Sequence, residues 1–195
     1  MPLNYYKIIP VVFLHFKHTV EIRRCTNTLS EFVYHNIALI TTNDCAVHLL
    51  VVNKNVGEIV QGDKTSDEPL TETYKAFIAQ RDAKPGQVFM GLPHRLDRPV
   101  SGIVVLAKTS KALTRLNEMI RNGEIHKTYW AITEARPSTE EGSLTHYIVR
   151  DGRTNRSRAY DKPKADGKKA MLNYSVLGCS ARYTLVEVEL LTGRH

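Results

Sequence analysis

Apolar residues gather into strand-length runs along the chain from about residue 47 onward. Two largely apolar runs, at 47–52 and 102–107, predict buried strands. Asn and Gly after the first run predict a turn at 53–57, because these residues tolerate unusual backbone angles. Four more strands are expected at 126–133, 145–149, 171–177 and 183–190. The last of these alternates between apolar and acidic residues, so its two faces differ in polarity.

Two other segments have the 3.6-residue period of an amphipathic helix. The first is expected to begin near Pro69, behind Ser66 and Asp67, and its apolar face is formed by Leu70, Tyr74, Phe77 and Ile78. The second is capped by Thr109 or Ser110, ends at Gly123, and has an apolar face formed by Leu113, Leu116, Met119 and Ile120. Consecutive strands with a few helices predict an α+β fold, in which helices pack on a mixed, largely antiparallel β-sheet.

The N-terminal part of the chain follows neither period. Residues 1–40 are expected to form a poorly patterned extension, in which the apolar run 8–16 is a buried strand. Residues 41–195 are expected to form one domain. The run 8–16 is too short for a membrane span, which needs about 20 residues. Three widely spaced cysteines suit neither a disulfide framework nor a metal site, which favours a reducing, cytoplasmic setting.

The charge of the chain favours a polyanionic partner. Its 27 Lys and Arg residues against 20 Asp and Glu give a net charge of +7. Between residues 150 and 169, eight basic residues stand against three acidic ones, so most of the excess lies in this stretch. Two interpretations remain open for it: a solvated loop that keeps the protein soluble, or a surface that binds the phosphates of a nucleic acid.

Candidate chemistry lies in the irregular segment 92–102, which precedes the second buried strand. Two prolines and a glycine make this loop rigid, and Asp97 lies between Arg95 and Arg98. Nearby cations keep a carboxylate ionised, and an ionised, oriented carboxylate can act as a nucleophile or as a base. The alternative is that Asp97 and a neighbouring arginine form an ion pair that only fixes the loop.

Four short blocks distinguish these interpretations. They are His94-Arg95-Leu96-Asp97-x-x-x-Ser101-Gly102, then Leu106-Ala107-Lys108-Thr109, Lys127-Thr128-Tyr129 and Leu191-Thr192-Gly193-Arg194-His195. In their order and spacing they resemble the RluA-type pseudouridine synthases, which isomerise uridine in rRNA or tRNA. The resemblance extends over roughly the second half of the chain. A weaker match at residues 51–57 has Asn55 where the family usually has proline.

The resemblance implies a role for individual residues. Asp97 matches the essential carboxylate, Tyr129 matches a tyrosine that contacts the target base, and Arg194 matches an arginine that pairs with the aspartate. Arg95 matches a residue that helps to fill the space left by the flipped nucleotide. The reaction needs neither a cofactor nor a metal. The base must leave the RNA stack to be reached, and backbone contacts have to offset that cost.

RNA, either rRNA or tRNA, is therefore the expected partner, and no membrane is expected. The basic residues expected to contact RNA are Arg95, Arg98, Lys108, Lys127, Arg150, Arg153, Arg156 and Arg158. Residues 41–195 become a pseudouridine synthase catalytic domain, expected to lack its C-terminal part because the last block breaks off at His195. Two alternatives remain. One is a non-catalytic RNA-binding protein that keeps the fold. The other is a hydrolase with an aspartate nucleophile, which is disfavoured because the sequence has no Gly-rich phosphate loop, metal cluster or Ser-His arrangement beside Asp97.

Overall fold

The structure is a computed structural model that describes residues 48–83, 85–154 and 156–193, and the backbone alone of 11–16, 22–23 and 37–40. The chain divides into two compact units. We call residues 11–126 the N-terminal unit and residues 127–193 the C-terminal unit, and each is described by itself.

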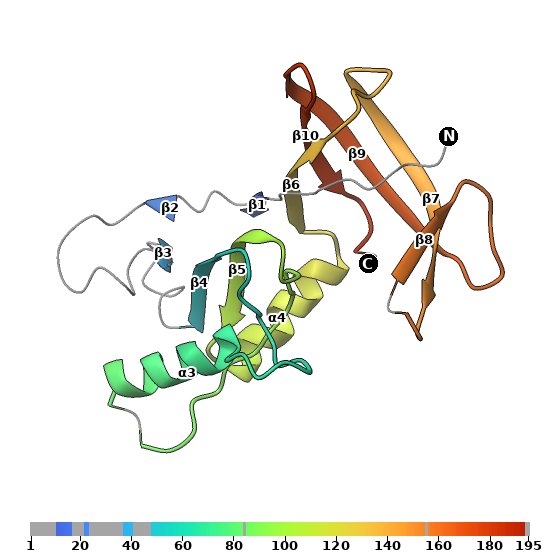
Figure 1. Cartoon of the computed structure of the whole chain (residues 1–195). Coiled ribbons are helices and arrows are strands. Elements are labelled where there is room, and N and C mark those ends of the chain that lie inside the picture. The colour runs from blue at the N-terminus through green and yellow to red at the C-terminus, as the bar shows by residue number, and fades with distance from the viewer. Residues whose placement is uncertain are drawn as a thin grey trace. The chain divides into compact units, whose positions relative to one another are not determined.

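Five strands form the sheet of the N-terminal unit (Figure 1). They are β1 (Val11–Phe16), β2 (Ile22–Arg23), β3 (Ile37–Ile40), β4 (Leu49–Lys54) and β5 (Ser101–Ala107). Their order is β2-β3-β4-β5-β1, and every neighbouring pair is antiparallel except β1 with β5. β4 is paired with β5 along its whole length, from Leu49 opposite Ala107 to Lys54 opposite Gly102.

Two helices accompany these strands. Helix α3 (Leu70–Arg81) begins after Pro69, and α4 (Ser110–Arg121) begins after Thr109, as expected. The Thr109 side-chain oxygen accepts a hydrogen bond of 3.2 Å from the Ala112 amide, which satisfies one of the free amides at a helix start. α4 contacts β5, and Figure 1 shows both helices next to the β4–β5 pair.

The core of the N-terminal unit is centred on β4 and β5. Val52, Val104 and Leu106 are fully buried, and Ile78 of α3 is fully buried as well. One charged side chain is equally inaccessible: Lys54, the last residue of β4, is 1% exposed. The expected turn at 53–57 therefore begins two residues late, because β4 continues as far as this lysine.

Five antiparallel strands form the sheet of the C-terminal unit, in the order β6-β10-β9-β7-β8. They are β6 (Ile125–Thr133), β7 (Glu141–Asp151), β8 (Arg156–Tyr160), β9 (Lys168–Cys179) and β10 (Thr184–Leu190). Figure 1 shows β7, β9 and β10 as long strands side by side. In this unit the structure describes no helix in residues 127–154 and 156–193.

The two faces of this sheet differ, as the alternation in residues 183–190 predicts. Ala131 lies opposite Val186 and Thr133 opposite Thr184, and all four are buried. On the other face, the Trp130 indole N–H donates a hydrogen bond of 3.0 Å to the Glu187 carboxylate. One face is thus packed and the other polar.

The expected α+β class with a largely antiparallel sheet is confirmed, and so is each expected strand and helix from residue 47 onward. Two strands are longer than expected, since β7 and β9 extend beyond 145–149 and 171–177. β8 was not expected, because its sequence is basic and lacks a regular alternation. Strand β1 lies within the run 8–16, whose expected burial falls outside the described side chains.

Candidate active site

The segment that carries Asp97 runs along one edge of β5. Gly91 and Ala107 exchange two backbone hydrogen bonds of 2.7 and 2.8 Å. A Cβ atom on Gly91 would lie 2.8 Å from the end of the Leu113 side chain, so a larger residue here would require that side chain to shift. Three residues later, the His94 Nε2 accepts a 3.0 Å hydrogen bond from the Val105 amide. The segment is therefore fixed to the strand before it reaches Asp97.

Beyond Asp97 the backbone turns back toward the start of β5. The Val100 amide donates a 3.0 Å hydrogen bond to the Asp97 carbonyl, which closes a tight turn. Leu96 is buried, with 6% of its surface exposed, whereas the side chain of Asp97 is exposed. An accessible carboxylate thus lies at the turn of a loop whose neighbouring residues are fixed.

Lys54 fixes the loop from β4. Its ammonium donates hydrogen bonds to three carbonyl oxygens, those of Asn55 (3.0 Å), Arg98 (3.2 Å) and Val100 (2.5 Å). Burial lowers the pKa of Lys54, and the negative charges of Glu58 and Asp97 act in the opposite direction. A buried ammonium therefore supports the turn that presents Asp97, and its pKa is raised by the negative charge of Asp97.

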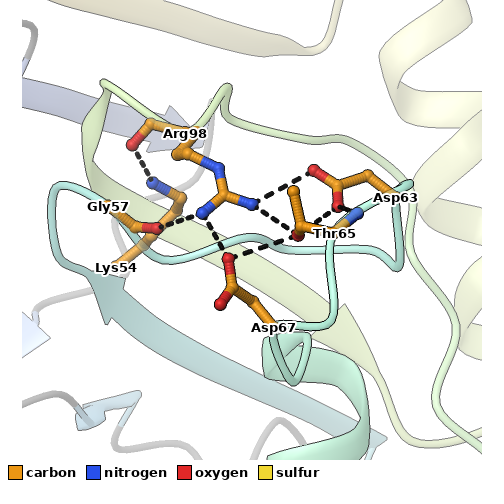
Figure 2. A network of polar contacts seen from close by, with 6 residues as sticks. All are labelled: Lys54, Gly57, Asp63, Thr65, Asp67 and Arg98. Carbon is orange, nitrogen blue, oxygen red and sulfur yellow. Dashed lines mark hydrogen bonds and ion pairs between the residues drawn. The ribbon is translucent and has the colours of Figure 1, made fainter.

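Arg98 is held by the segment between β4 and α3 (Figure 2). Its guanidinium donates to the carboxylates of Asp67 at 2.6 Å and Asp63 at 3.2 Å, and to the Thr65 hydroxyl at 2.8 Å. Arg95, on the other side of Asp97, is exposed and contacts the Gln61 side chain at 3.4 Å. Of the two arginines that flank Asp97, Arg98 therefore pairs with Asp63 and Asp67.

The remaining expected catalytic residues lie in the C-terminal part of the chain. Tyr129 and Lys127 are half-buried on β6, and burial lowers the pKa of Lys127. Tyr129 belongs to the C-terminal unit and Asp97 to the N-terminal unit. Arg194 lies outside the described residues.

The strand register brings the basic residues of the C-terminal unit to one end of its sheet. β6, β8 and β9 begin at this end, and β7 and β10 finish there. We call it the basic end, and its cations are Lys127, Arg150, Arg156, Arg158, Lys168 and Lys169. This end is staggered, because Thr128 of β6 is level with Asn173 of β9 and Ser143 of β7, whereas Arg150 and Arg156 lie farther along, at the tip of β7 and β8. Arg153 lies in the exposed turn between β7 and β8, next to this end.

Several contributors to the Asp97 loop were not expected from the sequence. Lys54 falls in a block that we interpreted as a turn, and Asp63 and Thr65 have no motif that identifies them. Lys108, the third basic residue of the expected RNA surface in the N-terminal unit, follows β5 and is half-buried. Among the residues that the structure describes, no group of three or more His, Cys, Asp or Glu side chains could hold a metal ion, and no helix is long and apolar enough to cross a membrane.

Comparisons with known proteins identify the family of this chain. The family model of RNA pseudouridylate synthases matches residues 48–195. The ribosomal large subunit pseudouridine synthase D of Zymomonas mobilis is 31% identical over 149 residues, which cover 75% of this chain and 46% of the relative. The tRNA pseudouridine synthase C of Vibrio cholerae is 30% identical over 161 residues, which cover 75% of this chain and 62% of the relative.

A solved structure, that of the human protein named RNA pseudouridylate synthase domain containing 4, superposes with a TM-score of 0.63 at 25% identity. The match covers 75% of this chain and 57% of the human one. The chain spans about half the length of the first curated relatives it matches. Since the family model covers well over half of the chain and the fold agrees, the chain belongs to the RluA-type RNA pseudouridine synthase family.

Proposed function

We propose that this protein is an RNA pseudouridine synthase, an isomerase that converts specific uridines in rRNA or tRNA to pseudouridine with Asp97 as its catalytic carboxylate. One observation carries the proposal: the exposed Asp97 lies on a loop fixed by the Lys54 ammonium and by β5. Rigid placement of a reacting group is a main source of rate enhancement in enzymes. Relatives named for the ribosomal large subunit and for tRNA make both RNAs candidate substrates.

The reaction breaks the bond between uracil and C1′ of the sugar and joins the base again through carbon. Nothing is lost and no electrons leave, so side chains suffice for the chemistry. An ionised Asp97 either attacks the sugar or base covalently or takes a proton from the sugar. Tyr129 contacts the target base and is a candidate for removing the C5 proton, and Arg194 pairs with Asp97. These roles rest on the family resemblance of the matching residues.

Access to the uridine requires base flipping, which costs a few kcal/mol of stacking and pairing free energy. Arg95, exposed beside Asp97, helps to fill the space that the flipped nucleotide leaves. Contacts to phosphates offset the cost. In the C-terminal unit, these contacts come from Lys127, Arg150, Arg153, Arg156 and Arg158 at or next to the basic end, and Lys108 adds a cation after β5.

The test is product formation on bulk rRNA and tRNA, mapped at single-nucleotide resolution. Wild type forms pseudouridine at defined sites, whereas Asp97→Asn forms none and still binds RNA. Glu118→Gln, which removes an exposed carboxylate from α4 of the same unit, is the matched control and keeps full activity. If wild type binds RNA in a salt-dependent way but forms no product, the protein is a non-catalytic RNA-binding member of the family. Product formation by Asp97→Asn would refute the catalytic assignment.

A further inference from the structure

The Arg98 guanidinium is occupied by protein groups on both of its terminal nitrogens. Nη1 donates to the Asp67 carboxylate at 2.6 Å and to the Gly57 carbonyl at 3.4 Å. Nη2 donates to the Asp63 carboxylate at 3.2 Å and to the Thr65 hydroxyl at 2.8 Å. A forked guanidinium can join several acceptors in this way, which a lysine ammonium cannot reproduce with the same geometry.

The acceptors around Arg98 are held together among themselves, as Figure 2 shows. The Thr65 hydroxyl contacts the Asp63 carboxylate at 2.5 Å and the Asp67 carboxylate at 3.2 Å, and its amide donates to Asp63 at 2.8 Å. Hydrogen bonds from Thr65 lower the pKa of Asp63, and the hydrogen bond from Arg98 lowers the pKa of Asp67. Both carboxylates therefore stay ionised at neutral pH and remain paired with Arg98.

The same segment reaches the Asp97 loop at two further points, and Lys54 of β4 adds a third contact. The Gly57 amide donates a 2.9 Å hydrogen bond to the Arg98 carbonyl. Lys54 donates to that same carbonyl at 3.2 Å. Gln61 contacts Arg95 on the opposite side of Asp97. Residues 57–67 thus hold the residues on both sides of Asp97, and Arg98 makes the largest number of these contacts.

We propose that Arg98 is a positioning residue, which fixes the Asp97 loop to residues 57–67 through Asp63, Thr65 and Asp67 and does not contact RNA. The proposal rests on the proposed function for its effect on catalysis. An RNA phosphate that approached Arg98 would have to displace the carboxylates of Asp63 and Asp67. A carboxylate that stayed near Arg98 would repel the phosphate. Arg98 therefore differs from the exposed arginines of the basic end, although the sequence alone places it in the same class.

Three variants distinguish positioning from RNA contact. Arg98→Gln removes the charge, Arg98→Lys keeps the charge but loses the fork, and Asp63→Asn with Asp67→Asn leaves Arg98 intact without its partners. Positioning predicts that all three lower kcat, by about 10- to 100-fold for a displacement of the order of 1 Å, with little change in KM. It also predicts that Arg98→Lys resembles Arg98→Gln. Contact with phosphate predicts instead that Arg98→Lys resembles wild type.

Two readouts do not depend on activity. The slope of log K for RNA binding against log salt stays at the wild-type value in Arg98→Gln, whereas a lost phosphate contact lowers it by about 0.7 to 0.9. Hydrogen exchange of the Val100 amide, which closes the Asp97 turn, becomes faster in Arg98→Gln and in the double Asn variant. The matched control is Glu72→Gln, which breaks the exposed Lys75–Glu72 pair on α3 and leaves every readout unchanged.

The outcomes separate this proposal from the proposed function. Unchanged Val100 exchange, or a smaller salt slope in Arg98→Gln, overturns the positioning role even if the enzyme is active. If wild type forms no pseudouridine, the proposed function fails, and exchange together with the salt slope still decides the role of Arg98. Faster exchange with an unchanged slope supports positioning in either case.

Discussion

Replacement of Lys54 by methionine tests the buried cation beneath the Asp97 turn. Methionine keeps most of the side-chain volume and removes the ammonium, which donates to three carbonyl oxygens. The Arg98 carbonyl retains its hydrogen bond from the Gly57 amide, and the Asn55 carbonyl belongs to an exposed residue that water can reach. The Val100 carbonyl, bonded to Lys54 at 2.5 Å, loses this donor in a half-buried position.

The size of the effect follows from two opposing contributions. A buried carbonyl left without a donor costs about 1–3 kcal/mol. The lowered pKa of Lys54 shows that its burial as an ammonium is itself unfavourable, so removal of the charge offsets part of the loss. We expect Lys54→Met to lower the free energy of unfolding by about 2 kcal/mol, which corresponds to a decrease in Tm of about 4–8 °C for a chain of this size.

The pH dependence has a defined sign. The pKa of Lys54 is lower in the folded protein than its ordinary value of 10.5, so between these two values the unfolded chain binds more protons than the folded one. Stability from this residue therefore increases as the pH rises through that window. The stability of Lys54→Met lacks this increase, so the difference in free energy of unfolding between wild type and variant grows as the pH rises. The pKa of Lys127 is also lowered, but this lysine is present in both proteins, so its contribution to the pH dependence cancels in the difference.

The assay is urea unfolding of both proteins at neutral pH and at a pH just below 10.5, followed by circular dichroism. Activity at neutral pH is measured in parallel, because loss of the Lys54 contacts frees the Asp97 turn. If Lys54→Met is as stable as wild type, relief of the buried charge offsets the lost hydrogen bonds in full, and the expected net loss of stability is wrong. If the difference between the two proteins fails to grow at high pH, the argument from burial is wrong.

Three other changes test separate features of the structure. Leu106→Ala, at a fully buried position of β5, is expected to lower the free energy of unfolding by about 2–5 kcal/mol in urea titrations. Thr109→Ala removes the cap of α4 and costs about 1 kcal/mol in the same assay. Charge reversal of Arg156 and Arg158 at the basic end weakens RNA binding and lowers its salt dependence, measured by titration at several salt concentrations, whereas reversal of Arg182 at the opposite end of the sheet has little effect. If Arg182→Glu weakens RNA binding equally, the basic stretch 150–169 is a solvated loop and not an RNA-binding surface.

The sequence predicts the elements of this fold wherever the apolar period is strong. The buried runs at 47–52 and 102–107 and the amphipathic helix after Thr109 appear within two residues of their expected positions. β8 is not predicted because its stability comes from pairing with β7. The sequence pattern of β8 itself does not indicate that pairing. Local pattern therefore identifies elements, and register has to come from the structure.

In the candidate site, too, some residues can be predicted from the local sequence and others cannot. Asp97 is identifiable from its block, since several residues of the block lie next to one another in the sequence. Lys54 and Asp67 contact Arg98 of that block from 44 and 31 residues away in the chain, and only folding brings them to it. Arg98 illustrates the limit: adjacent to Asp97, it suggests a partner for that carboxylate or for RNA, yet its guanidinium bonds to Asp63 and Asp67.

The position of the Asp97 loop along β5 also bears on solubility. β1 pairs with β5 at Ser101 and Gly102, and beyond these residues the same edge of β5 is occupied by Gly91 and by the His94 imidazole. An apolar strand whose edge amides are unpaired is a template for intermolecular pairing. The loop that presents the carboxylate thus also shields an aggregation-prone edge. Variants that loosen it, such as those at His94, should be checked for self-association before a loss of activity is assigned to catalysis.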